Sequence, residues 1–454
     1  MGETRTLAKF VHDLTFESLS NELVEKTKVI MIDTLSCVVA GNVIANEECD
    51  IIRKFAEDHG GDGATIWFTD GKKSGTMVAA LANSLMAHTI DFDDTHMDSV
   101  SHFGAALTGT VLTLGQHLGA SGKDIITAFV AGFEVAARVG NSVNKDGRSH
   151  YKYWHPTATA SAVGAAAAAA KLYKLNEAEI EMAISLGADQ ASGFRYCVDK
   201  GDYSKGLHPG WASLRGIMAA KLTKLGAEGP IGLLEYPTGF CQAMSEKPNL
   251  EYLTAGLGTE FETLSDAIKL FPTIHCSHTS IESALDIVNE HDIDYRDIEK
   301  IYIEVTELAK GQGMNFEPDG VLAARLSVPC CVSIALRKKQ LTLTDFTTED
   351  IFSDENQNLM KRIEIQPNDQ FLIDYPTGMV GHMTITMKDG TEYFAGHEYP
   401  KGHPLRPAEE EDYYNKFISL VTLRWDQAKS EKMYNAFNQL ETYETVDDLI
   451  SLLK

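Results

Sequence analysis

The stretch from His88 to His102 constrains the fold of this chain more than any other. It holds four aspartates and three histidines within fifteen residues, and it lies between two strongly apolar runs at 77–88 and 105–118. Runs of that composition are typical of buried helices, and charged groups are costly to bury unless they are paired. This segment must therefore pair its ionisable side chains with one another or bind a ligand.

Helical patterns fill most of the first 266 residues. Gly41 is a plausible end for the helical spacing in 7–41, Ser121 suits an N-cap, and Pro156 suits a first helical turn. Further helices are predicted from apolar or alanine-rich composition at 77–88, 105–118, 125–139, 157–171, 182–191 and 211–225.

The pattern changes after about residue 266. Residues 298–304 alternate as in a strand, and Asp389-Gly390 joins two alternating segments as in a hairpin. The segment from 397 onward is helical and polar again. We predict a mainly α protein, in which a large all-α helical domain (1–266 and 397–454) is interrupted by a smaller α+β domain (267–396) inserted before the C-terminal helices.

Composition excludes several classes of function. A length of 454 residues favours two domains, and a formal net charge of −25 leaves no basic excess for nucleic acid or an anionic membrane. No run approaches eighteen uninterrupted apolar residues, so no membrane span is predicted. Seven cysteines without a CxxC pair indicate reduced thiols in a cytoplasmic protein.

Three further segments place lysine or histidine beside proline or glycine, at or near the start of a predicted helix. They are 151–156, with His155-Pro156; 205–211, with His208-Pro209; and 269–278, which contains Pro272. Side chains at such positions often converge on a cleft, and helix amides attract anions there. A single His-Pro pair is more often a surface cap, and Asp93 and Asp94 are by type more often helix caps. Four histidine-bearing segments in one acidic chain favour a shared site.

The sequence motifs give little support for a metal site or a nucleotide site. Residues 93–98 resemble an aspartate-rich magnesium motif, but no second ligand set appears and the nearby imidazoles do not suit Mg²⁺. An EF-hand, an HExxH motif and a glycine-rich nucleotide loop are all absent from the sequence. We therefore predict no metal and no cofactor. The remaining hypothesis is acid–base chemistry by lysine and histidine on a small polycarboxylate.

Taken together, these segments resemble the MmgE/PrpD family of 2-methylcitrate dehydratases, cis-aconitate decarboxylases and iminodisuccinate epimerases. The resemblance extends over essentially the whole chain. Its motifs are His88-x-x-Asp91-Phe92-Asp93-Asp94-Thr95, His102-x-Gly104, His150-Tyr151-x-x-Trp154-His155-Pro156-Thr157, Lys205-x-x-His208-Pro209-Gly210-Trp211 and Lys269-x-x-Pro272-x-x-His275-x-x-His278.

The resemblance implies a helical domain and a lid domain with the active site between them, no cofactor, and a homodimer. It assigns catalysis to Lys205, Tyr151, His102, His155 and Asp91, although Tyr153 is near enough to leave the choice of tyrosine open. It assigns substrate binding to His208, Lys269, His275 and His278.

Three departures from the family pattern bear on the substrate. Cys330 stands where decarboxylases carry a tyrosine, Ile274 replaces a decarboxylase histidine, and one extra residue separates Asp91 from His102. The predicted function is a cofactor-independent lyase or isomerase on a di- or tricarboxylate, with 2-methylcitrate-type dehydration first. Epimerisation of the iminodisuccinate type, cis-aconitate decarboxylation and non-catalytic carboxylate binding are the alternatives.

Overall fold

The chain forms two compact units, which are described separately. A computed structural model describes residues 2–372 and 379–454. Unit 1 comprises residues 1–196, 203–268 and 409–454, and unit 2 comprises 197–202 and 269–408. The short helix α9 (Tyr196–Lys200) begins at the end of the first segment of unit 1.

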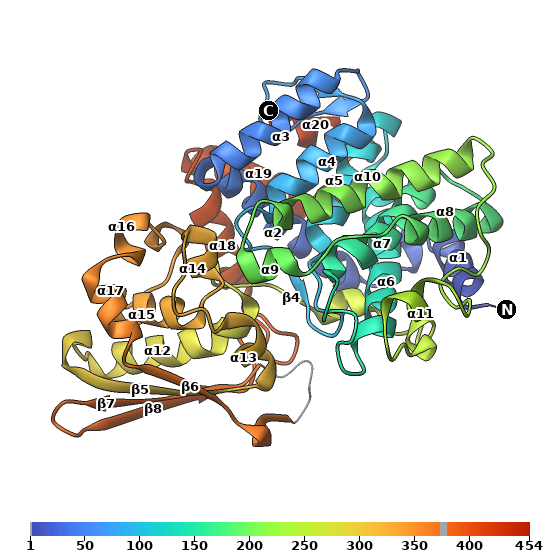
Figure 1. The fold of residues 1–454 in the computed structure, drawn as a ribbon. Helices are drawn as coiled ribbons and strands as arrows, with labels where there is room; N and C mark the ends of the chain where they lie inside the picture. The colour runs from blue at the N-terminus through green and yellow to red at the C-terminus, as the bar shows by residue number, and fades with distance from the viewer. Residues whose placement is uncertain (1, 373–378) are drawn as a thin grey trace. The chain divides into compact units, whose positions relative to one another are not determined.

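Unit 1 is almost entirely helical, which confirms the predicted mainly α character (Figure 1). Two small antiparallel pairs accompany the helices, β1 (Ala64–Thr65) with β2 (Lys73–Ser74) and β3 (Thr95–His96) with β4 (Asp266–Ala267). The helices are α1 (Glu3–Asp13), α2 (Asn21–Ile44), α3 (Asn46–His59), α4 (Thr76–His88), α5 (Phe103–Leu118), α6 (Gly122–Asn144), α7 (Pro156–Leu172), α8 (Glu177–Asp189), α10 (Ser204–Lys224), α11 (Phe240–Met244), α18 (Glu410–Val421), α19 (Gln427–Asn438) and α20 (Asp447–Ser451).

Several helix ends follow local capping chemistry. The Ser121 hydroxyl accepts a hydrogen bond from the Asp124 amide at the start of α6, and Pro156 occupies the first turn of α7, both as predicted. Two predicted ends are wrong. α2 continues past Gly41 to Ile44. Glycine at this position allows a close approach of α2 to the backbone carbonyl of Met86 and does not end the helix. α10 begins at Ser204, with Pro209 inside the helix.

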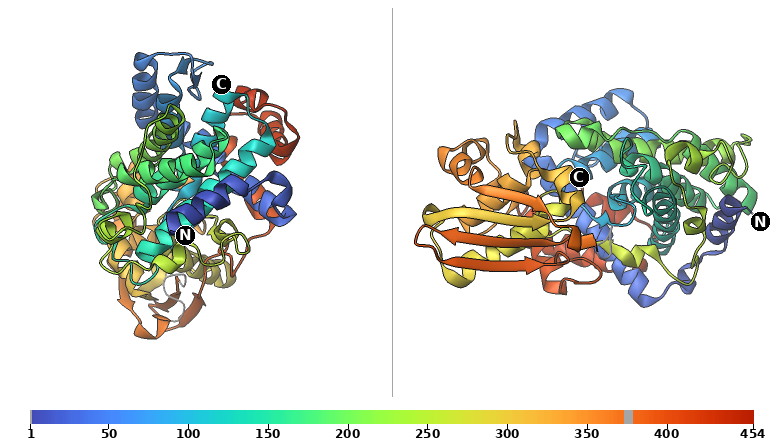
Figure 2. Two further views of the ribbon diagram at one scale, coloured as in Figure 1. Left: turned by 90° about the vertical axis from the view of Figure 1, so that its right-hand side faces the viewer. Right: turned by 60° about the horizontal axis from the view of Figure 1, so that its bottom comes forward.

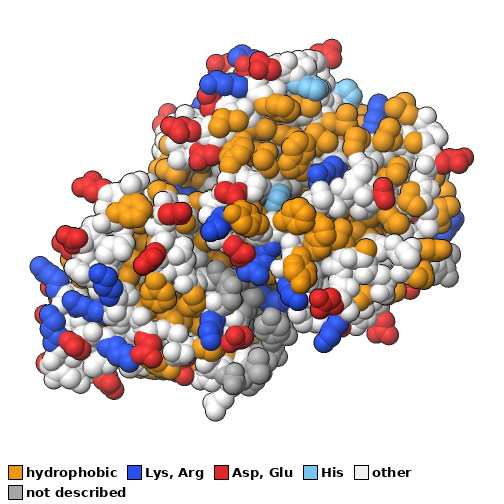
Figure 3. Space-filling view, in the orientation of Figure 1, with side chains coloured by type: hydrophobic (Ala, Val, Ile, Leu, Met, Phe, Trp, Pro, Cys, Tyr) orange, Lys and Arg blue, Asp and Glu red, His pale blue; other side chains and the backbone are white. Residues whose placement is uncertain are grey.

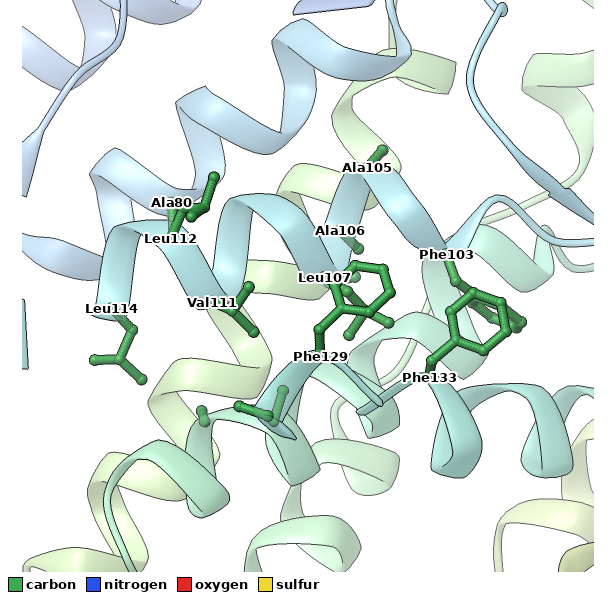
Figure 4. Packing of buried hydrophobic residues seen from close by; sticks show 14 of the residues in the cluster. Ala80, Phe103, Ala105, Ala106, Leu107, Val111, Leu112, Leu114, Phe129 and Phe133 are labelled. Carbon is green, nitrogen blue, oxygen red and sulfur yellow. The ribbon is translucent and has the colours of Figure 1, made fainter. Parts of the chain in front are cut away.

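Buried aromatic and aliphatic side chains fill the space between α4, α5 and α6. Phe103, Leu107, Phe129 and Phe133 are fully buried in this core, and the rings of Phe103 and Phe133 meet edge to face with centroids 5.2 Å apart (Figure 4). α2 is long and apolar enough to cross a membrane, but 83% of its apolar window is buried inside the protein. Burial of that extent is what a core helix shows.

α6 and α7 approach each other at glycines. A Cβ atom on Gly164 would lie 2.5 Å from the Gly132 carbonyl oxygen and 2.6 Å from the Ala136 Cβ. No side chain fits there without moving backbone, since real Cβ contacts essentially never fall below 3.0 Å.

Replacement of Gly164 with Ala is therefore expected to lower the free energy of unfolding by about 1–3 kcal/mol, the usual cost of overpacking a core. Urea denaturation followed by circular dichroism measures the change. Gly75→Ala is the control, because its Cβ would meet no atom within 4 Å and its φ of −54° suits alanine. Equal midpoints for the two variants would contradict the expectation.

Unit 2 is built on a four-stranded sheet with the strand order β6-β5-β7-β8. The central strand β5 (Ile298–Val305) pairs parallel with β6 (Ile363–Pro367) and antiparallel with β7 (Gly381–Met387). β7 and β8 (Glu392–His397) form the predicted hairpin, whose turn contains Gly390 at φ 88°. β6 was not predicted.

Helices cover this sheet along its length (Figure 2). α12 (His278–His291) packs on β7 and β8, and α15 (Val328–Lys338) packs on α12. The shorter helices of unit 2 are α13 (Glu307–Gly313), α14 (Val321–Arg325), α16 (Thr348–Ile351) and α17 (Asp354–Met360).

Candidate active site

Lys205 is at the centre of a buried cluster of ionisable side chains in unit 1. The residue lies in the first turn of α10 and is 3% exposed. Its Nζ is 2.8 Å from His88 Nε2 and 2.8 Å from Asp91 Oδ1. The sequence predicts Lys205 just before a helix, whereas the residue lies inside the first turn of α10. From there its side chain reaches His88 at the end of α4.

His88 is the last residue of α4, and it connects Lys205 to a second carboxylate. Its Nδ1 lies 2.9 Å and 2.8 Å from the two carboxylate oxygens of Asp93. Burial lowers the pKa of His88, and the nearby Lys205 charge adds to that effect while the Asp93 charge opposes it. The ring is therefore neutral near pH 7.

His102 is held beside His88 by the backbone. Its Nδ1 donates to the Asp94 carbonyl at 2.6 Å, and its ring centroid is 4.8 Å from that of His88. A carbonyl can only accept, so the proton of a neutral His102 ring is on Nδ1.

The Asp94 carboxylate anchors the start of α5. It accepts the backbone N–H groups of Phe103 (3.1 Å) and Gly104 (3.0 Å), which are unsatisfied donors at a helix N-terminus. A Cβ at residue 104 would lie 2.3 Å from Asp94 Oδ1 and 2.6 Å from Thr34 Oγ1. The glycine of the His102-x-Gly104 motif is thus needed for the carboxylate to reach these amides.

His155 and His208 form a second imidazole pair. Their Nδ1 atoms are 2.8 Å apart, so one ring donates the hydrogen bond and the other accepts it. The His155 ring centroid is 6.2 Å from that of His88. Burial lowers the pKa of His155 well below its usual value, and the charges of His208 and Lys205 lower it further. Deep burial thus keeps His155 neutral, a form that can accept a proton.

The two candidate tyrosines differ in burial. Tyr151 is 7% exposed, its amide donates to Asn144 Oδ1 at 2.9 Å, and the Arg195 guanidinium lies 5.0 Å from its ring centroid. Tyr153 is 55% exposed. Burial favours Tyr151 as the tyrosine of the site, and its role in proton transfer stays a prediction.

The remaining candidate residues lie in unit 2. Lys269, His275 and His278 are 1%, 5% and 0% exposed. The two imidazole rings have centroids 4.7 Å apart, and Phe271 meets His278 edge to face at 5.4 Å. The roles of Lys269, His275 and His278 in substrate binding stay predictions.

Unit 1 contains a buried acidic cluster that includes two aspartates of the 88–102 segment and two from other segments. It consists of Asp33, Asp93, Asp94 and Asp266, accompanied by the ammonium groups of Lys26 and Lys416. Burial raises the pKa of Asp33 to about 6 and that of Asp94 to about 8, and it raises the pKa of Asp266 well above its usual range. In each case charges of the neighbouring aspartates add to the effect.

Helix α18, in the C-terminal segment of unit 1, supplies one of the two lysines. Lys416 Nζ lies 2.5 Å from Asp33 Oδ1 and donates to the Phe92 carbonyl at 2.7 Å, while Lys26 Nζ donates to the Asp266 carbonyl at 2.6 Å. The sequence analysis did not identify Lys26, Lys416, Asp33 or Asp266. Nothing local marks them, because Asp266 and Lys416 lie hundreds of residues from Lys26 and Asp33, their partners on α2.

A metal ion would find four possible ligands of two types, imidazole and carboxylate, in the Lys205 cluster. The ligand atoms of His88, Asp91, Asp93 and His102 all lie within 4.8 Å of one another. Lys205 Nζ, however, already occupies the position between His88 and Asp91 that a cation would take. The donor set therefore fits a lysine-centred acid–base site better than a metal centre.

Comparison with known proteins gives two matches to one family. The MmgE/PrpD N-terminal domain matches residues 5–253, and the MmgE/PrpD C-terminal domain matches residues 271–442.

Curated relatives align over almost the whole chain. The cis-aconitate decarboxylase of Homo sapiens is 25% identical over 99% of this chain and 94% of its own length. The enzyme of Mus musculus is 24% identical over 99% and 93%, and that of Aspergillus terreus is 22% identical over 100% and 96%. With both domain matches in order, the chain belongs to the MmgE/PrpD family of enzymes.

Proposed function

We propose that this protein is a lyase that acts on a small di- or tricarboxylate by acid–base chemistry. One observation carries the proposal: Lys205 Nζ is held at 2.8 Å by both His88 and Asp91 in a buried cluster that also holds His102 and His155. Buried and oriented groups of this kind can move a proton at carbon and stabilise the negative charge that forms next to a carboxylate.

Individual roles follow from position and from the family resemblance. Lys205 exchanges the proton at the carbon next to a carboxylate, with Tyr151 as its counterpart, and Asp91 orients Lys205. His102 and His155 protonate or hold the leaving group. Substrate carboxylates are bound by His208, Lys269, His275 and His278.

Dehydration of a 2-methylcitrate-type substrate is the reaction that we put first. A C–H bond next to a carboxylate breaks and its proton passes to the base. The neighbouring C–O bond then breaks, and the hydroxyl leaves as water after taking a proton from an acid. An imidazole that has taken up one proton, and so has become imidazolium, can supply that proton. The cluster contains several imidazoles.

Decarboxylation of cis-aconitate is the second candidate, because the curated relatives named above carry that activity in their names. In that reaction a C–C bond breaks, CO₂ leaves, and one proton is delivered to carbon. Against it stand Cys330 and Ile274, which replace a tyrosine and a histidine of the decarboxylase pattern.

One assay separates these reactions. The protein is incubated in deuterated water with 2-methylcitrate, citrate, cis-aconitate or iminodisuccinate and followed by ¹H and ¹³C NMR. Dehydration gives an alkene without loss of carbon, decarboxylation gives CO₂ and a product with one deuterium, and epimerisation gives a deuterated substrate of inverted configuration. Binding without turnover of any compound would contradict the lyase proposal and favour a carboxylate-binding protein.

Chelation tests the lysine-centred site. We expect that dialysis against EDTA leaves turnover within about twofold of the untreated protein, because Lys205 occupies the position of a cation. Loss of activity that added Mg²⁺ or Zn²⁺ restores would contradict this expectation.

We infer that the protein is a homodimer that associates through unit 1. Hydrophobic side chains gather over α4 and α10 on one face of the molecule (Figure 3). Large exposed apolar residues on these helices, at the C-cap of α10 and on the neighbouring α3 include Ile51 (58% exposed), Phe55 (50%), Met77 (36%), Leu222 (41%) and Leu225 (72%). Exposed apolar groups of this size commonly mark a protein interface.

Light scattering after size exclusion should therefore give about twice the chain mass of 49.8 kDa. Phe55→Asp should shift the mass toward that of one chain, because a carboxylate would be buried in the interface. Phe394→Asp on β8 is the control, since Phe394 is also exposed (63%) but lies in unit 2. A monomeric wild-type protein would exclude the dimer.

We also infer that the protein resides in the cytoplasm. Cys37, Cys49, Cys241, Cys330 and Cys331 are free and buried. Persistent unpaired thiols are typical of a reducing compartment.

A further inference from the structure

The hydrogen-bond chain from Asp93 through His88 to Lys205 is a feature that the proposed roles do not use. Asp93 and His88 are both buried, with 0% and 2% exposure. The contacts run from Asp93 Oδ2 to His88 Nδ1 at 2.8 Å, and from His88 Nε2 to Lys205 Nζ at 2.8 Å. Asp91 completes the chain on the far side of Lys205.

Hydrogen-bond chemistry fixes the direction of this chain. The carboxylate of Asp93 accepts, so His88 Nδ1 donates and carries the ring proton. In a neutral ring the lone pair is then on Nε2, which accepts an N–H from Lys205. Without Asp93 the proton could move to Nε2, where it would oppose the N–H groups of Lys205 at 2.8 Å.

The same hydrogen bonds fix the direction of the third N–H bond of Lys205 Nζ. Nζ is tetrahedral, with one bond to carbon, one hydrogen bond to His88 and one to Asp91. One N–H, or one lone pair after deprotonation, is left with a defined direction. A proton-transferring group needs that orientation more than it needs a particular charge.

We propose that His88 and Asp93 are positioning residues for Lys205: Asp93 keeps the proton of His88 on Nδ1, and His88 Nε2 holds Lys205 in the orientation that transfers protons. The expected effect on kcat rests on the proposed function. The prediction of which His88 ring nitrogen carries the proton does not depend on that function. The titratable groups that face His88 are Asp93, Lys205 and Asp91, with the rings of His102 and His155 at 4.8 Å and 6.2 Å.

The first test needs no substrate. Two-bond ¹H–¹⁵N NMR of the full-length protein, labelled at histidine and assigned with His88→Gln, reports which ring nitrogen carries the proton. We expect the Nδ1–H form for His88 in the wild-type protein. In Asp93→Asn the amide can donate to Nδ1, so we expect the Nε2–H form. An Nε2–H ring in the wild-type protein would overturn the proposal.

The second test uses turnover of whichever compound the substrate assay identifies. Asp93→Asn should lower kcat at least about tenfold with little change in KM, because an analogous carboxylate-to-amide change in a His–carboxylate pair acts through the wrong tautomer. His88→Ala should lower kcat similarly. His88→Gln should recover part of it, because the glutamine amide oxygen can accept from Lys205 where Nε2 did, and its kcat should lose any pH dependence that comes from titration of His88.

A matched pair elsewhere in unit 1 controls for the loss of a buried contact. His96 Nε2 lies 3.1 Å from Glu262 Oε2 in a second His–carboxylate pair, which also contacts Ser99 and Arg138. Glu262→Gln should leave kcat within about twofold. If Asp93→Asn has no larger effect than Glu262→Gln, the proposal fails. If no substrate is turned over, the lyase proposal fails while the NMR result still decides the tautomer.

Discussion

Replacement of Lys205 with Ala is expected to lower turnover at least about a hundredfold, because general acid–base groups typically contribute two to four orders of magnitude. The substitution removes the side chain that contacts both His88 Nε2 and Asp91 Oδ1. The loss should appear mainly in kcat, measured with the substrate that the NMR assay identifies. Turnover near that of the wild-type protein would remove Lys205 from the mechanism.

Lys205→Arg separates proton transfer from charge. Arginine keeps a positive charge and can donate to both partners, but it does not lose a proton at accessible pH. If Lys205 acts as a base, Lys205→Arg should be nearly as inactive as Lys205→Ala. If it only provides charge, Lys205→Arg should keep a substantial share of the activity.

Stability must be measured for the same variants. Lys205→Ala removes the ammonium group that pairs with the buried Asp91 carboxylate, and breaking a buried pair commonly costs several kcal/mol. A thermal melt with circular dichroism shows whether the variant is folded at the assay temperature. Lys221→Ala on the same helix is the control, since its ammonium packs over Tyr173 at 5.6 Å.

Local sequence patterns predicted the helices of unit 1 well, because most of their signals act within a few residues. Ser121 caps α6 and Pro156 opens α7 for reasons that depend only on neighbouring backbone. The same reasoning placed the turn at Asp389-Gly390 between β7 and β8. It failed at Gly41, whose reason is contact with a carbonyl 45 residues further along the chain.

The site was predictable in part. Motifs pointed to Asp91, His102, His155, Lys205 and His208, and the structure places all five in or beside one buried cluster of unit 1. By residue type, Asp93 and Asp94 are both expected to be helix caps. The structure separates them: Asp94 caps α5, whereas Asp93 contacts the His88 ring that holds Lys205.

No pattern could have identified the partners of the acidic cluster. Lys416 reaches Asp33 across 383 positions of sequence, and Lys26 reaches the Asp266 carbonyl across 240. Such pairs depend on how α2, α18 and β4 pack. Only the folded chain shows that four aspartates share two lysines.

The excess of four buried aspartates over two lysines predicts a second large effect, on the pH dependence of the free energy of unfolding. The pKa values of Asp33, Asp94 and Asp266 are all raised, chiefly by burial, so the folded protein keeps protons that the unfolded chain releases above about pH 4. Stability from this cluster is fully present below that pH and is lost as pH rises toward 8. Each proton held contributes a slope of about 1.4 kcal/mol per pH unit.

Asp266 is the best candidate to hold one of these protons. Neither of its carboxylate oxygens has a hydrogen-bond partner among the described residues, whereas Asp94 accepts backbone amides that favour its charged form. Asp266→Asn makes the group permanently neutral at nearly the same volume. The variant should exceed the stability of the wild-type protein by only about 1 kcal/mol near pH 5, and this difference should grow by a few kcal/mol toward pH 8.

Urea unfolding midpoints at half-unit steps from pH 5 to 9 measure this difference, and far-UV circular dichroism reports it. Asp13→Asn is the control, because hydrogen bonds from Lys9 and His12 lower the pKa of this exposed carboxylate. Asp13→Asn should therefore show no gain at high pH. If Asp266→Asn follows the wild-type pH dependence, the excess proton is not held at Asp266. If the wild-type midpoint does not fall between pH 5 and 8, the four aspartates hold no excess proton, and the two lysines compensate their charge by themselves.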